Sequence, residues 1–70
     1  DLSYAVLAKA VLKGANLRLA DLTNADLRGA DLSFADLSRA RIGGARFEGA
    51  LLEGAVWVDG RRCDPGGCPR

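Results

Sequence analysis

The sequence of 70 residues contains no histidine and no methionine, and only four of its residues are aromatic. Histidine is the commonest general base and the commonest metal ligand, so its absence removes the usual basis for acid–base catalysis and metal binding. No wholly apolar run is longer than four residues, as at 5–8, which excludes a transmembrane helix. Because a chain without methionine cannot begin at a translation start, we expect Asp1 to be a processed or excised end.

An excess of one charge is also missing, since ten basic and nine acidic residues give a net charge of +1. Charge therefore does not indicate a nucleic-acid partner. Serines such as Ser3, Ser33 and Ser38 have no histidine to activate them, which excludes serine nucleophile chemistry. We expect one small domain that is not an enzyme, with no cofactor, no metal site and no small-molecule substrate.

The most informative feature is a repeat of five residues. Alanine occupies every fifth position from 5 to 55, and a large apolar residue follows each alanine after two positions. A period of five spreads apolar residues around an α-helix and sends them to alternate faces of a flat strand. A short extended segment followed by a turn keeps them on one side, and repeated turning produces a hollow coil. The pattern predicts an all-β fold, a β-helix lined by Leu and Ala, with Gly and Asn at the turns.

Charge stacking indicates how many sides the coil has. A turn of twenty residues stacks opposite charges in neighbouring coils four times and like charges once, Asp1 with Asp21, whereas a turn of fifteen stacks opposite charges twice and like charges twice. The four pairs are Asp21 with Arg41, Asp26 with Arg46, Arg28 with Glu48, and Arg39 with Asp59. Four sides are favoured, and each exposed pair contributes only a few tenths of a kcal/mol.

Segments such as Ala-Asn-Leu-Arg-Leu (15–19) and Ala-Asp-Leu-Arg-Gly (25–29) closely resemble the pentapeptide-repeat family, whose consensus is Ala, Asp or Asn, Leu and two variable residues. The resemblance covers residues 1–59 and implies a right-handed quadrilateral β-helix of about three coils. Departures from the consensus fall at positions that face outward in the family: Val6, Val11, Arg41, Arg46, Leu51 and Val56. Because the first coil has no cap, we expect a fragment of a longer solenoid.

Residues 60–70 break the repeat and are predicted to form a short irregular cap, with Trp57 and Phe47 filling the adjacent end. Cys63 and Cys68 enclose a short turn and can form a disulfide or remain free thiols; a zinc site would need more ligands. The segment 55–63 is similar to the closing segment of exported bacterial pentapeptide-repeat proteins. That resemblance implies a disulfide between the two cysteines and export to the periplasm or a similar oxidising compartment, the alternative being the cytoplasm.

Function is predicted to reside in the outer surface. The four aspartates at 21, 26, 31 and 36 point to four sides of one coil, so they cannot converge on a substrate. Stacking by twenties groups Val11, Phe34 and Leu51 on one outer face, and this set is the candidate surface for a protein partner or a second copy. Alternatively, Phe34 covers the backbone of Gly14 and Gly54 within its own chain.

A second outward group is expected at Leu19, Val56 and Val58. The predicted function is a non-enzymatic structural or protein-interaction module within a longer exported bacterial protein. The alternative is a fragment of a DNA-mimicking topoisomerase (gyrase) inhibitor, which some family members are. That mechanism needs a long rod with an acidic face, whereas Arg41 and Arg46 are basic.

Overall fold

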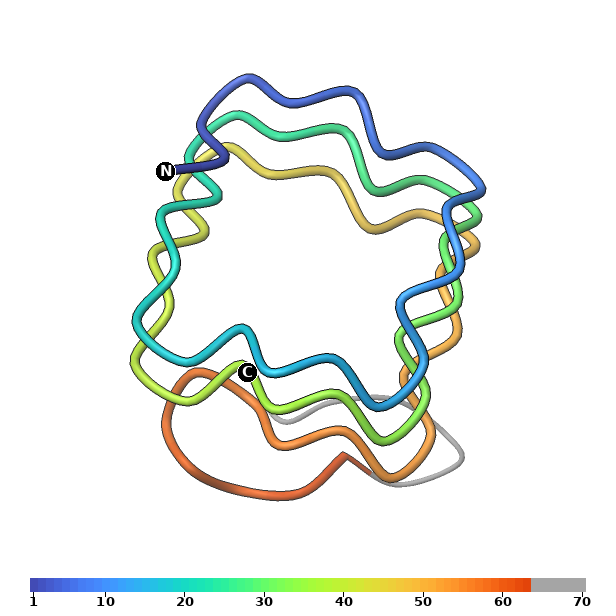
Figure 1. The fold of residues 1–70 in the computed structure, drawn as a ribbon, viewed down its shortest axis with the longest axis vertical. Helices are drawn as coiled ribbons and strands as arrows, with labels where there is room; N and C mark the ends of the chain where they lie inside the picture. Colours follow the sequence, from blue (N-terminus) through green and yellow to red (C-terminus); the bar gives the residue numbers. More distant parts are fainter. Residues whose placement is uncertain (64–70) are drawn as a thin grey trace.

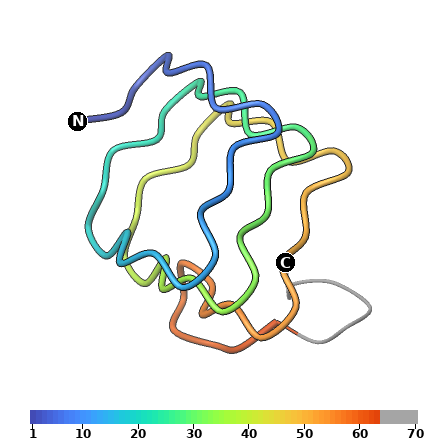
Figure 2. The ribbon, with the colours of Figure 1, turned by 45° about the vertical axis from the view of Figure 1, so that its right-hand side comes forward.

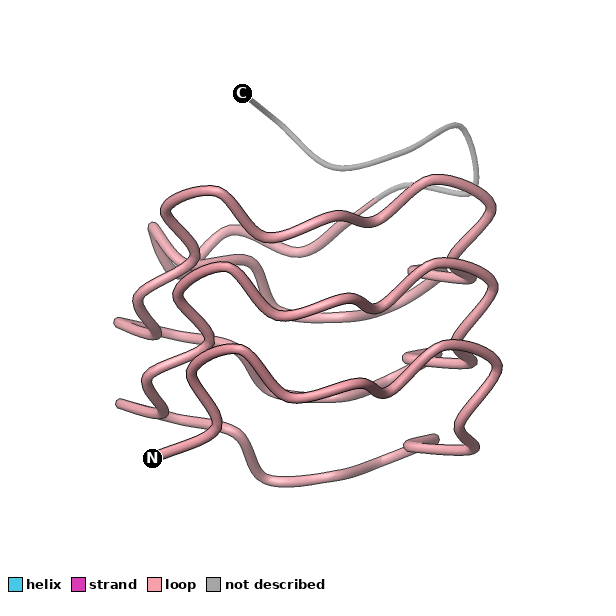
Figure 3. Cartoon of the chain, turned by 90° about the horizontal axis from the view of Figure 1, so that it is seen from above, coloured by secondary structure: helices cyan, strands magenta, loops and turns pink. Residues whose placement is uncertain are grey.

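The chain winds around a four-sided ring that is stacked into coils (Figure 1). The computed structural model describes residues 1–63. Within this range there is no helix, and the extended segments are isolated β-bridges at single residues separated by turns. Successive coils lie directly over one another when the stack is seen from the side (Figure 3). The five-residue period therefore produces one short side of the ring per repeat.

Each parallel bridge joins two residues that are twenty positions apart, as Val6 does with Asp26 and Asp26 with Arg46. On each side of the ring, backbone hydrogen bonds connect neighbouring coils: Leu7 N–H donates to the carbonyl of Asp26 at 2.8 Å, and Asp26 N–H donates to that of Ala5 at 2.9 Å. Four repeats consequently make one turn, as the charge stacking predicted. We call residues 1–20, 21–40 and 41–60 the first, second and third coils.

Every corner of the ring is a tight turn closed by a backbone hydrogen bond. Ala5 N–H donates to the carbonyl of Leu2 at 3.0 Å, and the same bond recurs at each repeat. The residue before the alanine has a positive φ, as at the third position of a type II turn. Glycine occupies five of these corners in residues 1–55; the other six carry Tyr4, Lys9, Leu19, Asn24, Phe34 and Arg39.

Where Asp or Asn precedes the leucine of a repeat, it stabilises the turn that follows. The carboxylate of Asp21 accepts the backbone N–H of Thr23 at 3.1 Å, and Asn16 accepts that of Arg18 at 3.2 Å. Asp and Asn side chains commonly bond to the backbone two residues further on. The repeat uses these two residue types because each can satisfy an N–H that the turn leaves unpaired.

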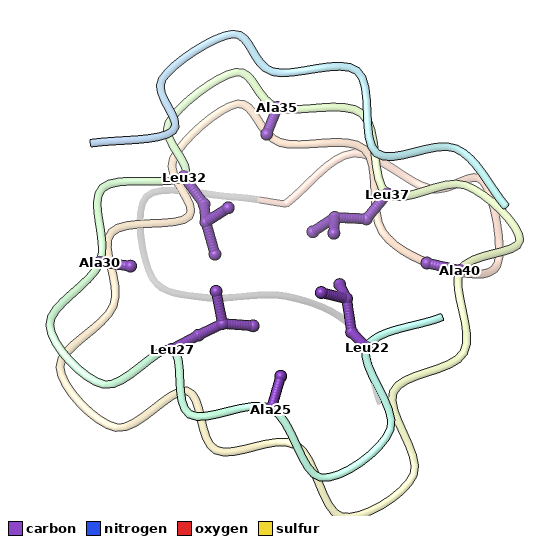
Figure 4. Packing of buried hydrophobic residues seen from close by; sticks show 8 residues of the cluster. All are labelled: Leu22, Ala25, Leu27, Ala30, Leu32, Ala35, Leu37 and Ala40. Atoms are coloured by element: carbon purple, nitrogen blue, oxygen red, sulfur yellow. The ribbon is translucent and has the colours of Figure 1, made fainter. Parts of the chain in front are cut away.

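The core lies in the second coil, where leucine and alanine side chains point into the ring (Figure 4). Its fully buried residues are Leu22, Ala25, Leu27, Ala30, Leu32, Ala35 and Leu37. The corresponding leucines of the first coil are half-buried, because no coil covers them on one side among the described residues. Complete burial of one leucine contributes roughly 1.5–3 kcal/mol, so the second coil provides most of the apolar stabilisation.

At the end of the third coil the chain turns back on itself (Figure 2). Arg62 forms an antiparallel bridge with Val56, and Cys63 N–H donates to the carbonyl of Ala55 at 2.6 Å. The ring of Trp57 meets that of Phe47 edge to face, with 5.4 Å between centroids. Both aromatics are half-buried and pack against the core on the side of the third coil, where the sequence predicted them.

Candidate interaction surface

One side of the β-helix carries a row made of Val11, Asp31 and Leu51. Parallel bridges join Val11 to Asp31 and Asp31 to Leu51, so the three residues stack in consecutive coils. Val11 is 79% exposed and Leu51 is 57% exposed, whereas Asp31 is half-buried between them. We call this side of the molecule, residues 11–14, 31–34 and 51–54, the third face.

Phe34 occupies the corner of the third face in the second coil. Its φ is +62° and its side chain is 57% exposed. A Cβ atom added to Gly54 would lie 2.5 Å from Cδ1 and Cε1 of the Phe34 ring, whereas one added to Gly14 would meet nothing within 4 Å. The ring therefore leans over Gly54 and leaves the backbone of Gly14 open. Intrachain cover accounts for part of the ring, and more than half of its surface remains available for contact.

Two further exposed apolar residues were not included in the candidate surface. Val6 is 82% exposed and Tyr4 is 73% exposed, both in the first coil. Val6 stands where the consensus has Asp or Asn, and this departure from the consensus was the signal in the sequence for an exposed apolar residue there. The second predicted outward group is only partly correct: Leu19 is 69% exposed, but Val56 is half-buried and Val58 is half-buried and packs against the core. The chain then turns back so that Arg62 pairs with Val56, and a five-residue pattern does not contain that reversal.

The four aspartates of the second coil lie on four sides of the ring, each bound to its own turn. Hydrogen bonds from Thr23 and Ser38 lower the pKa of Asp21 and Asp36, respectively. The side-chain hydrogen bonds from Arg28 lower the pKa of Asp26 from 3.8 to about 2. A hydrogen bond from Ser33 lowers the pKa of Asp31. These carboxylates remain charged at neutral pH, and each one binds the turn of its own repeat. They therefore do not converge on a ligand.

The charge pairs expected between coils are in register but are not close ion pairs. Bridges place Asp21 beside Arg41 and Asp26 beside Arg46, yet neither pair approaches within 4.0 Å among residues 1–63. Arg28 instead binds Asp26 of its own repeat at 2.8 Å. The carboxylates are directed toward their own turn N–H groups, which pulls them away from the arginines of the next coil.

Residues 1–63 contain no group of three or more His, Cys, Asp or Glu side chains that is suited to a metal ion. No helix in the same range is long and apolar enough to cross a membrane. Cys63 is 3% exposed beside Ala55, and Cys68 lies outside the described residues. The predicted pairing of these two cysteines therefore stays a prediction.

Comparison with known proteins defines the class. A family model for pentapeptide repeats matches residues 1–39 and 15–54, in eight copies. The chain belongs to the pentapeptide-repeat family, whose members form right-handed quadrilateral β-helices and are generally non-enzymatic. The fold expected from the resemblance is therefore confirmed at the level of the family.

Among solved structures, the crystal structure of HetL is similar to this chain. HetL is a pentapeptide repeat protein involved in heterocyst differentiation regulation from the cyanobacterium Nostoc sp. strain PCC 7120. The TM-score is 0.82 and the sequence identity is 36%, over 84% of this chain and 28% of the HetL chain. This chain thus spans less than a third of that relative. No curated protein matches the sequence.

Proposed function

We propose that this chain is a non-enzymatic β-helical module that binds another protein through the third face. The observation that supports the proposal is the exposure of Val11, Phe34 and Leu51 together on one side of the molecule. Aromatic side chains exposed in this way are frequent anchors of protein interfaces. Exposed apolar side chains that gather on one side of a protein mark contact sites, and here two of the three lie on either side of Asp31.

The backbone at Phe34 supports the same proposal. A left-handed conformation costs a non-glycine residue about 1–2 kcal/mol, and five of the other corners avoid this cost with glycine. Phe34 covers Gly54 with only part of its ring, so an in-chain role does not require a side chain of this size. Five other non-glycine corners share this conformation, but on the third face Phe34 is the one corner residue that keeps it without being glycine.

The alternative, a DNA-mimicking topoisomerase inhibitor, receives less support. Such a mimic needs acidic residues repeated along one face through many coils. Bridges place Arg41 next to Asp21 and Arg46 next to Asp26, so two of the four acidic sides become basic in the next coil. We therefore favour the protein-interaction module.

Chemical cross-linking in cells that produce the full-length protein tests this function. Leu51→Ser removes an apolar side chain of the third face, and Val6→Ser is the matched control because Val6 is exposed on another side. We expect a cross-linked product of defined mass that Leu51→Ser reduces and Val6→Ser does not. Equal yields for the two variants, or no product at all, would argue against the third face as a binding site.

We also propose that residues 1–59 form a three-coil β-helix, that residues 60–70 cap it, and that the protein is exported. The reversal that pairs Arg62 with Val56 supports the cap, since it covers part of the backbone edge of the third coil. A disulfide between Cys63 and Cys68 fits an oxidising compartment. Intact-mass analysis after alkylation without reductant tests this pairing: two alkylated thiols contradict it, and none supports it.

A further inference from the structure

The charges on the third face are arranged so that two copies of this face are complementary to each other. Gly14 N–H donates to the carbonyl of Ser33, and Phe34 N–H donates to that of Glu53, so Lys13, Ser33 and Glu53 follow one another in consecutive coils. Lys13 and Glu53 are both exposed, at opposite ends of this second row. In the first row, Val11 and Leu51 also lie at opposite ends with Asp31 between them.

From this arrangement we infer that the partner of the third face is a second copy of the chain, packed face to face about a twofold axis along the strands. This inference rests on the proposed function. The axis places the first coil of one copy over the third coil of the other. Val11 then meets Leu51 of the second copy, Lys13 meets Glu53, and the two Phe34 rings come together at the corner. Each of the first two contacts occurs twice.

The other three sides do not match themselves in this way. The same operation on the neighbouring side would place Val6 over an arginine, Arg46, and Ala8 over Glu48. On the side formed by residues 16–19, 36–39 and 56–59 it would place Arg18 over Val58. On the side formed by residues 1–4, 21–24 and 41–44 it would pair Asp1 with Arg41 but place Ser3 over Gly43, so that side has no apolar pair. Only the third face combines an apolar pair with an opposite-charge pair among the residues described, and this combination favours a second copy over an unrelated partner.

Asp31 is the one unfavourable element, because the axis brings the two Asp31 carboxylates to the same place. Its carboxylate accepts the N–H of Ser33 at 3.1 Å and forms no ion pair within 4.0 Å in residues 1–63. Like charges directly opposite each other are destabilising. Asn retains the bond to the turn, as Asn16 does in its own repeat. Asp31→Asn should therefore strengthen the dimer, about two- to fivefold in Kd.

The size of the face limits the affinity. A molecule with extents of 26 × 22 × 20 Å offers one flat side to its copy. Such a side buries less than the roughly 1,200 Å² in total that marks the lower limit for stable complexes. The dimer should be weak and reversible, with a dissociation constant on the order of 0.1–1 mM.

Sedimentation equilibrium of the 70-residue chain, up to about 1 mM, tests the inference with a charge exchange. Lys13→Glu should weaken association on the order of tenfold, because two ion pairs become two repulsions. The double variant Lys13→Glu with Glu53→Lys should restore it. Glu48→Lys is the matched control, since Glu48 has the same repeat position on the neighbouring side. Melting temperatures of all variants verify that the fold is intact.

Association that is weakened by Lys13→Glu and restored in the double variant supports the twofold dimer. A dissociation constant that Lys13→Glu leaves unchanged, or that the double variant does not restore, overturns the inference. A wild-type chain that stays monomeric at about 1 mM also overturns it. In that last case, a cross-linked product that depends on Leu51 would show that the third face binds a different protein. Loss of that product as well would refute the proposed function too.

Discussion

Placing a methyl group at Gly54 should destabilise the fold more than placing one at Gly14. Both glycines have nearly the same backbone conformation, with φ of +72° and +71°. Alanine at either position should cost about 1–2 kcal/mol for the left-handed conformation alone. At Gly54 the new Cβ would also lie 2.5 Å from two ring carbons of Phe34, whereas at Gly14 it meets nothing within 4 Å. Overpacking typically costs about 1–3 kcal/mol, and the lower end applies because an exposed ring can rotate away.

Urea denaturation of Gly54→Ala and Gly14→Ala measures this difference in the free energy of unfolding. The same two substitutions in a Phe34→Ala background complete the comparison, because without the ring the excess cost at Gly54 should vanish. The expected coupling between Phe34 and Gly54 is on the order of 1 kcal/mol. Equal costs at the two glycines in the wild-type background would refute the position of the ring. An excess that survives Phe34→Ala would refute the ring as its cause.

Three other outcomes follow from the same geometry. Leu27→Asp should unfold the domain in a thermal melt, because an unpaired charge would enter a fully buried site; a cooperative melt near the wild-type temperature would contradict the inward orientation. Since the folded pKa of Asp26 is lowered from 3.8 to about 2, its stabilisation is present above pH 3.8 and is lost as the pH falls toward 2. Asp26→Asn should make that acid-induced loss shallower in urea titrations, and an unchanged slope would contradict it. Leu19→Asn should raise the free energy of unfolding by about 1 kcal/mol, because Asn tolerates positive φ better; a decrease would argue against backbone strain there.

The inward half of the structure could be predicted from the sequence. Spacing alone placed Leu27 and Ala25 in the lumen, where both are fully buried. Opposite charges at intervals of twenty predicted the register that the bridge between Asp21 and Arg41 confirms. These features are predictable because a hollow coil accepts only small or aliphatic groups inside, and because one register repeats along the chain.

The contacts of the exposed side chains were harder to predict, because several possible partners lie within reach of each one. Asp26 pairs with Arg28 of its own repeat instead of an arginine in the next coil. A pattern does not reveal the direction in which the ring of Phe34 leans, since glycine lies at that corner in both neighbouring coils. The pairing of Arg62 with Val56 begins where the repeat ends, so the five-residue pattern does not predict it. The repeat thus determines the path and register of the backbone. The contacts of the exposed side chains depend on which neighbouring groups bind them.

The central claim is that the third face is the contact surface between copies of this chain. Backbone amide chemical shifts, recorded by NMR during dilution from about 1 mM, test it most directly. Three segments far apart in sequence, 11–14, 31–34 and 51–54, should change together with one dissociation constant while the other sides stay constant. Shifts that change on another side of the β-helix, or that do not depend on concentration, would contradict the claim.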